Sequence, residues 1–155
     1  MSVARLLASF GGSGYAPFAP GTAASLLAVL LGIPLLQAPP GMLALAAALA
    51  SLLGLWAIRA AQVEGDPGWV VIDEVAGQWI ALMGLARPTL PGLALAFALF
   101  RLFDIVKPGP VGWADRRGGA AGIMADDLIA GALAAGVVWA VRSQWPGVVD
   151  GMTPP

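Results

Sequence analysis

The chain has 155 residues, of which 59% are hydrophobic and only 11% are charged, and its formal net charge is -1. This composition excludes a disordered chain and a basic nucleic-acid-binding domain, and the length suits one domain rather than two. The sequence contains neither cysteine nor histidine. Any chemistry must therefore depend on carboxylates, lysine, arginine, hydroxyls and backbone groups.

Five apolar segments predict helices that span a membrane, which needs roughly 17 to 25 apolar residues. In chain order they are residues 22–38, 41–58, 69–86, 90–106 and 123–141. The alternative, buried helices of a soluble protein, leaves too few charged residues to coat a surface in contact with water. We predict an all-α, polytopic membrane bundle with about five transmembrane helices, formed by residues 1–142 as a single domain. Residues 143–155 are expected to form a short, polar, Pro-rich and loosely structured tail.

The positions of lysine and arginine predict the orientation of these segments. With five spans, the N-terminus and the loops 59–68 and 107–122 share one side of the membrane. That side carries Arg5, Arg59, Lys107, Arg116 and Arg117, whereas the other side carries Arg87 and Arg142. Because loops rich in lysine and arginine remain in the cytoplasm, we expect the N-terminus to be cytoplasmic and the C-terminus to be outside.

Acidic residues lie inside three of the apolar segments. They are Asp73, Glu74, Asp104, Asp126 and Asp127. An acid at the bilayer centre costs about 2.5 to 3.5 kcal/mol, so such residues are usually functional. At 1.5 Å per residue, each of them lies within about 3 to 6 Å of the cytoplasmic end of its segment. We expect the third, fourth and fifth segments to bring these acids together.

Several carboxylates in a small volume require protons or cations for neutralisation. Arg101 can pair with Asp104, three residues further along one helix, but negative charge remains in excess. Carboxylates and a substrate phosphate are typical ligands of Mg²⁺, so the acids predict a Mg²⁺ site. The alternative is that they stabilise helix N-termini. That suits Asp126 and Asp127 but explains poorly why three helices converge.

Neighbouring acids on a helix point about 100° apart, from 3.6 residues per turn, so only one member of each adjacent pair is expected to aim fully at a shared centre. Gly77 and Gly131 follow Asp73 and Asp127 by four residues, on the same helix faces. Small residues there would let two helix backbones approach closely. Plain packing explains these glycines equally well.

A glycine- and proline-rich segment, residues 11–22, precedes the first apolar segment. Its glycines expose backbone N–H groups, a helix start adds further free N–H groups, and Thr22 and Ser25 add hydroxyls, so the segment could bind a phosphate. The alternative is an entry turn with Thr22 as the helix N-cap. Taken alone, the segment favours this alternative.

Three blocks of sequence together resemble the phosphatidylglycerophosphatase A family. They are Gly-Ser-Gly-Tyr-Ala-Pro-Phe-Ala-Pro-Gly-Thr-Ala-Ala-Ser-Leu at 12–26, Asp-Pro-Gly-Trp-Val-Val-Ile-Asp-Glu-Val-Ala-Gly at 66–77, and Phe-Arg-Leu-Phe-Asp-Ile-Val-Lys-Pro-Gly-Pro at 100–110, which continues to Gly-Ile-Met-Ala-Asp-Asp-Leu-Ile-Ala-Gly at 122–131. The resemblance implies a Mg²⁺-dependent hydrolase of the bacterial inner membrane. It would convert phosphatidylglycerophosphate to phosphatidylglycerol and phosphate. Ala24 departs from the glycine expected before Ser25.

The resemblance carries over to specific positions of this chain. Its acidic positions are Asp66, Asp73, Glu74, Asp104, Asp126 and Asp127, its basic positions are Arg101 and Lys107, and its Gly-Thr is Gly21-Thr22.

We therefore predict a lipid phosphatase whose active site faces the cytoplasm. The predicted catalytic residues are Asp73, Glu74, Asp104 and Asp127; the predicted metal ligands are Asp73, Glu74, Asp126 and Asp127; the predicted substrate-binding residues are Thr22, Ser25, Arg101 and Lys107. Attack by water and a phospho-aspartyl intermediate both remain open. The alternative function is a small transporter of protons or cations, because intramembrane carboxylates also mark such proteins. The sequence sets no oligomeric state.

Overall fold

The regular secondary structure of the chain is entirely helical over residues 1–151, the range that this computed structural model describes. The helices are α1 (Val3–Ala8), the 3-10 helix η1 (Ser13–Tyr15), α2 (Pro20–Gln37), α3 (Met42–Ala60), α4 (Ile72–Leu82), α5 (Leu90–Val106), α6 (Pro110–Asp115), α7 (Gly119–Gln144) and α8 (Pro146–Val149). The predicted all-α class is thus confirmed, and the bounds of α5 agree with the predicted segment 90–106.

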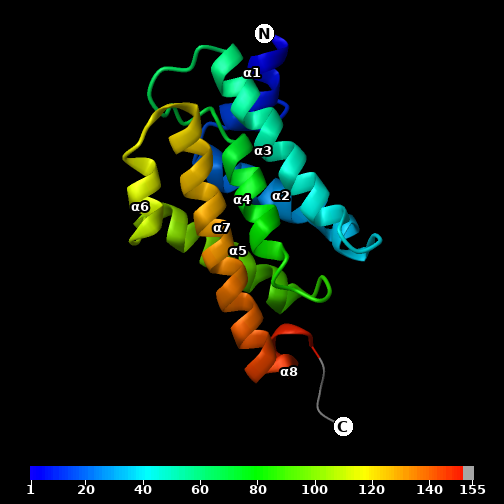
Figure 1. Cartoon of the computed structure of the whole chain (residues 1–155). Helices are drawn as coiled ribbons and strands as arrows, with labels where there is room; N and C mark the ends of the chain where they lie inside the picture. Colours follow the sequence, from blue (N-terminus) through cyan, green and yellow to red (C-terminus); the bar gives the residue numbers. More distant parts are fainter. Residues whose placement is uncertain (152–155) are drawn as a thin grey trace.

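The short helix α4 forms the centre of the bundle. It packs against α2, α3, α5 and α7, and it lies between α3 and α7 in Figure 1. Nine of its 11 residues are buried. Most side chains of α4 therefore face other protein rather than lipid, and only Glu74 and Ile80 are partly exposed.

Within residues 1–151, three helices, α2, α3 and α7, are long and apolar enough to cross a membrane. They correspond to the predicted segments 22–38, 41–58 and 123–141, with α7 extended at both ends. Helix α5 has 17 residues and includes Arg101 and Asp104, and it is not among the three. The predicted count of about five spans is not confirmed.

The predicted span 69–86 differs most from the structure. Helix α4 has 11 residues, which at 1.5 Å per residue is about 16 Å and about half of a bilayer core. Before it, the backbone N–H of Val71 donates to the carbonyl of Ala8, which fixes the entry to the helix. After it, Gly84 packs so closely on α7 that an added Cβ would lie 2.6 Å from the Ala135 oxygen. The segment is apolar because protein surrounds it, and a helix buried on all sides needs no polar face.

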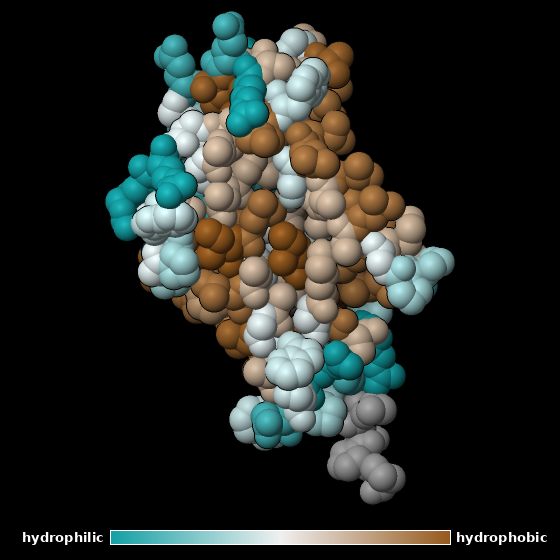
Figure 2. Space-filling view, viewed as in Figure 1, coloured by the Kyte–Doolittle hydropathy of each residue, from teal (hydrophilic) through white to brown (hydrophobic). Residues whose placement is uncertain are grey.

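Large apolar side chains are exposed on the outer faces of α2 and α3. They include Leu26, Leu30, Leu31, Leu45, Leu49, Leu52, Leu53 and Trp56. Figure 2 shows hydrophobic residues gathered over the middle of the molecule, with hydrophilic residues toward its two ends. Exposed apolar surface of this extent indicates a membrane protein.

The C-terminal segment is better ordered than the sequence predicted. Ser143 and Gln144 belong to α7, and α8 buries Val149, whose carbonyl accepts a hydrogen bond from the Thr89 hydroxyl. Asp150 lies 3.3 Å from Arg142. The expectation of a loose tail is therefore wrong for residues 143–151, and residues 152–155 lie outside the described range. Helices α1 and α8 lie at opposite ends of the molecule (Figure 1).

Candidate active site

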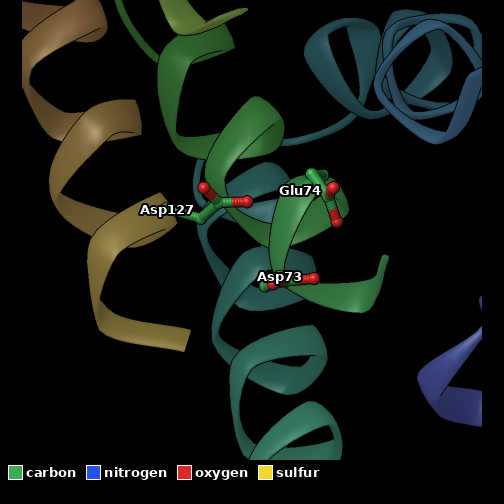
Figure 3. Close-up of side chains that lie close together, drawn as sticks. All are labelled: Asp73, Glu74 and Asp127. Carbon is green, nitrogen blue, oxygen red and sulfur yellow. The ribbon is translucent and has the colours of Figure 1, made fainter. Parts of the chain in front are cut away.

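Three acidic side chains from two helices lie together inside the bundle. Asp73 and Glu74 are in the first turn of α4, and Asp127 is on α7. One carboxylate oxygen of each lies within 4.8 Å of the others, and Figure 3 shows Asp127 reaching from α7 toward α4. Asp73 and Asp127 are only 6% and 3% exposed. A buried group of acids this compact is unfavourable unless a cation or protons neutralise it.

Two glycines allow α4 and α7 to cross closely enough for these acids to meet. A Cβ added at Gly131 would lie 2.3 Å from the carbonyl oxygen of Gly77, and a Cβ added at Gly77 would lie 2.5 Å from that of Asp127. No side chain larger than hydrogen fits at either position. The predicted close approach of the two backbones is confirmed.

The two pairs of adjacent acids behave differently. Asp127 joins the group of three, whereas Asp126 points toward Lys107, as expected if only one member of a pair faces the centre. Both Asp73 and Glu74 join the group, contrary to that expectation. The extra methylene of glutamate lets Glu74 reach around the helix, so both carboxylates lie near one point. The metal-ligand role of Asp126 remains a prediction.

Lys107 ends α5 and connects two acids from other helices. Its Nζ lies 2.5 Å from Asp115 Oδ1 on α6 and 2.6 Å from Asp126 Oδ2 on α7. Burial lowers the pKa of Lys107, but the hydrogen bonds to Asp115 and Asp126 outweigh it and raise the pKa above its usual value. The lysine is therefore charged throughout the physiological range and balances part of the local negative charge.

Arg101 and Asp104 form the ion pair that their spacing predicts, with 2.5 Å between Nη1 and Oδ2. Asp104 also lies close enough to Glu74 and Asp127 for their charges to interact. The last two turns of α5 thus bring one acid and one base to the edge of the three-carboxylate group. The catalytic role of Asp104 and the substrate-binding role of Arg101 remain predictions.

The glycine- and proline-rich segment reaches the site at the start of α2. A Cβ added at Gly21 would lie 2.2 Å from Glu74 Oε1 and 3.4 Å from Arg101 Nη1. Helix α2 begins at Pro20 after Ala19, so Thr22 lies inside the first turn and is not the N-cap. The Ser25 hydroxyl is fully buried and donates to the Gly21 carbonyl at 2.8 Å.

Earlier in this segment, Gly14 contacts the chain just before α4. A Cβ added at Gly14 would lie 2.0 Å from the Trp69 carbonyl oxygen, and the Tyr15 ring stacks on the Trp69 ring with 5.9 Å between their centroids. Asp66 lies in the loop before α4. Partial burial raises the pKa of its carboxyl group, the charge of Lys107 lowers it, and the charge of Asp115 raises it. The loop before α4 is therefore part of the surroundings of the site.

Sequence reasoning missed two polar residues near the site. Asp115 lies in a predicted loop, where an acid is ordinary, and only its position eight residues after Lys107 could have marked it. Gln78 follows Glu74 by one helical turn and is fully buried, and neither atom of its amide has a hydrogen-bond partner. A buried amide inside an apolar segment is the signal that could have identified Gln78.

The fold and the site together define a helical membrane protein with a buried carboxylate centre between α4 and α7. The family model for Phosphatidylglycerophosphatase A matches residues 6–142. The chain therefore belongs to the phosphatidylglycerophosphatase A family of lipid phosphatases.

Three curated proteins illustrate this relationship. The chain is 37% identical over 146 residues to Phosphatidylglycerophosphatase A of Escherichia coli, which covers 92% of this chain and 85% of that protein. It is 37% identical to Phosphatidylglycerophosphatase A of Haemophilus influenzae, over 89% of this chain and 88% of that protein. It is 44% identical to a Bacteroides thetaiotaomicron protein that is provisionally named a phosphatidylinositol-3-phosphatase, over 77% of this chain and 81% of that protein. No solved structure matches the chain significantly.

Proposed function

We propose that this protein hydrolyses phosphatidylglycerophosphate to phosphatidylglycerol and phosphate, with Mg²⁺ held by Asp73, Glu74 and Asp127. The observation that carries the proposal is the group of three carboxylates within 4.8 Å, in a chain of this family. Hydrolysis breaks the bond between phosphorus and the glycerol oxygen, consumes one water molecule and returns a proton to the departing alcohol.

The donor set suits a hard divalent cation. All three side chains offer oxygen, and Asp73 Oδ1 and Glu74 Oε2 are buried without a hydrogen-bond partner. A buried, unpaired carboxylate oxygen costs free energy that a bound cation recovers. When bound, Mg²⁺ would neutralise phosphate charge and favour attack on phosphorus, either by water or by a carboxylate.

Residues around the three acids are suited to hold the phosphate and the attacking group. The Arg101 guanidinium has five N–H donors, of which the Asp104 contact occupies only part, so it can also donate to phosphate oxygens. Two of the three Lys107 donors face Asp115 and Asp126, which leaves one for substrate. Thr22 and Asp104 complete the proposed site, with Asp104 orienting the nucleophile beside Asp127.

The proposed location is the bacterial inner membrane, with the site at the cytoplasmic surface. Asp73 and Glu74 lie in the first turn of α4, Asp104 lies near the end of α5, and Asp127 lies eight residues after the start of α7. A phospholipid phosphate lies at the membrane surface, so this depth matches a lipid head group better than the path of a transported ion. With α2, α3 and α7 as the spans, the N-terminus and residues 61–118 share one side, and only Arg142 lies on the other, which supports a cytoplasmic site.

Phosphate release by the purified, detergent-solubilised protein tests the proposal. We expect release from phosphatidylglycerophosphate that requires Mg²⁺, stops with a chelator and greatly exceeds release from phosphatidic acid. Comparable release from both lipids would contradict the head-group assignment. No release from either lipid by a folded sample would contradict the phosphatase, and an ion flux in vesicles would then favour the transporter.

The contact between α2 and Glu74 gives a second expected result. Gly21→Ala places a methyl group about where Glu74 Oε1 lies, because the added Cβ would be 2.2 Å from that atom. We expect phosphate release to fall at least tenfold, the low end of the range for residues that orient metal ligands, about 10- to 100-fold. Gly68→Ala is the control, since its Cβ would meet only Pro20, at 3.9 Å. Equal activity of the two variants would show that the contact between α2 and Glu74 does not position the site.

A further inference from the structure

Asp115 is an acid of the site region that has no assigned role. It ends α6, a six-residue helix packed on α7, and its side chain is 39% exposed. It lies 2.5 Å from Lys107, and it is not among the three acids that lie within 4.8 Å of one another. Its contact is therefore with the lysine and not with the proposed metal position.

The turn that carries Lys107 is strained. Lys107 has φ 50° and ψ 54°, in the left-handed region, and it precedes Pro108. For a residue with a side chain this conformation is unfavourable. Helix α6 presses against the turn, because a Cβ added at Gly112 would lie 2.6 Å from the Lys107 carbonyl oxygen. Strain of this kind persists only where surrounding contacts hold it, and it gathers at functional sites.

The contacts continue from Lys107 to the proposed metal ligand. Oδ2 of Asp126 lies 2.6 Å from Lys107 Nζ, and Oδ1 of Asp126 accepts a hydrogen bond from the backbone N–H of Asp127 at 3.0 Å. Both oxygens of Asp126 are thus engaged, one with the lysine and one with the residue that joins Asp73 and Glu74. An unbroken series of polar contacts connects α6 with Asp127.

We propose that Asp115 is a positioning residue, which through Lys107 and Asp126 holds Asp127 in place to bind a divalent cation. This inference rests on the proposed function. A lysine side chain is long and flexible, and two carboxylates, one from α6 and one from α7, hold its ammonium group. Without Asp115 the ammonium group loses one of these two contacts, Asp126 is held less firmly, and Asp127 is less well placed. Outer residues that orient metal ligands typically change metal affinity about 10- to 100-fold.

A Mg²⁺ titration of the detergent-purified protein tests this role with two measurements. One is the Mg²⁺ concentration that gives half of the maximal rise in Tm, and the other is the concentration that gives half-maximal phosphate release. We expect Asp115→Asn to raise both about tenfold. Glu64→Gln, which neutralises an exposed acid in the loop before α4, is the control and should leave both concentrations unchanged.

The route through Lys107 is tested by a double variant. If Asp115 acts only through the lysine, Asp115→Asn combined with Lys107→Gln should need no more Mg²⁺ than Lys107→Gln alone. If the double variant instead needs a Mg²⁺ concentration raised by the product of the two single increases, the route through Lys107 is contradicted. Should Asp115→Asn fail to fold, Asp115→Glu keeps the charge but shifts it by one methylene, and it should also raise the required Mg²⁺ concentration. An unchanged Mg²⁺ requirement in Asp115→Glu would overturn the proposal.

The outcomes separate this inference from the proposed function. A wild-type protein that Mg²⁺ neither stabilises nor activates contradicts the proposed function itself. A wild-type protein that responds to Mg²⁺, together with an Asp115→Asn variant that responds at the same concentrations, contradicts only the positioning role.

Discussion

Asp127→Asn should abolish phosphate release while leaving the protein at least as stable as the wild type in the absence of Mg²⁺. Asparagine keeps the shape of the side chain but removes the charge that a divalent cation needs. Loss of an outer residue alone lowers metal affinity by about 10- to 100-fold, so loss of a ligand should cost more than about 100-fold in activity. Because three buried carboxylates within 4.8 Å repel one another, removing one charge should maintain or raise the Tm measured in chelator. The same pattern is expected for Asp73→Asn.

Asp150→Asn provides the matched control for this substitution. Asp150 is also a buried aspartate, 8% exposed, but it pairs with Arg142 near the opposite end of α7. Its loss should lower Tm, because a buried partner is removed, and leave phosphate release nearly unchanged. The two substitutions thus have opposite expected effects on stability and activity. Full activity in Asp127→Asn would contradict the assignment of Asp127 as a ligand.

Gly131→Ala should destabilise the protein and inactivate it together. The added methyl group would lie 2.3 Å from the Gly77 carbonyl oxygen, so α4 and α7 must move apart. Overpacking of this kind typically costs about 1 to 3 kcal/mol in the free energy of unfolding. Separation of the helices also withdraws Asp127 from Asp73 and Glu74. We therefore expect a lower Tm, a higher Mg²⁺ requirement and at least a tenfold loss of phosphate release, which matches the effect of misplaced metal ligands.

Gly136→Ala tests whether the loss comes from the crossing or from replacing any glycine on α7. A Cβ at Gly136 meets nothing within 4 Å, and alanine favours a helix over glycine by about 1 kcal/mol. This variant should be as active as the wild type and no less stable. A Gly131→Ala variant that matched Gly136→Ala in Tm and activity would show that the close crossing does not position the acids.

The long apolar segments predicted which parts of the chain are helical. They could not distinguish a helix buried in lipid from a helix buried inside the protein. Residues 90–106 form a helix with the predicted bounds, and the first two segments agree to within two residues at each end. The third segment is apolar because α2, α3, α5 and α7 surround it, and this environment requires the same residues as lipid does. Only the short distance between Pro67-Gly68 and Gly84 in the sequence indicates that α4 is brief.

The acidic residues of the site could be predicted because each one is costly inside an apolar segment. Their pairing depends on the rotation of each helix, and sequence position does not give that rotation. Asp126 and Asp127 are neighbours in the chain, yet one lies 2.6 Å from Lys107 and the other joins Asp73 and Glu74. The sequence did not single out Asp115, because an acid in a loop carries no energetic cost. Its contact with Lys107 depends on the turn at 107–109 between α5 and α6.

The shortness of α4 also bears on how the protein is made. An 11-residue helix that begins with two acids is a poor substrate for insertion by itself, because each acid at depth costs about 2.5 to 3.5 kcal/mol. Two of the helices that pack on α4, α5 and α7, leave the ribosome later. During synthesis, α4 must therefore wait at the membrane surface until α7 has been inserted. Assembly of the bundle then follows an order different from that of the chain, and a nascent chain that stops before residue 119 should leave α4 accessible to a protease.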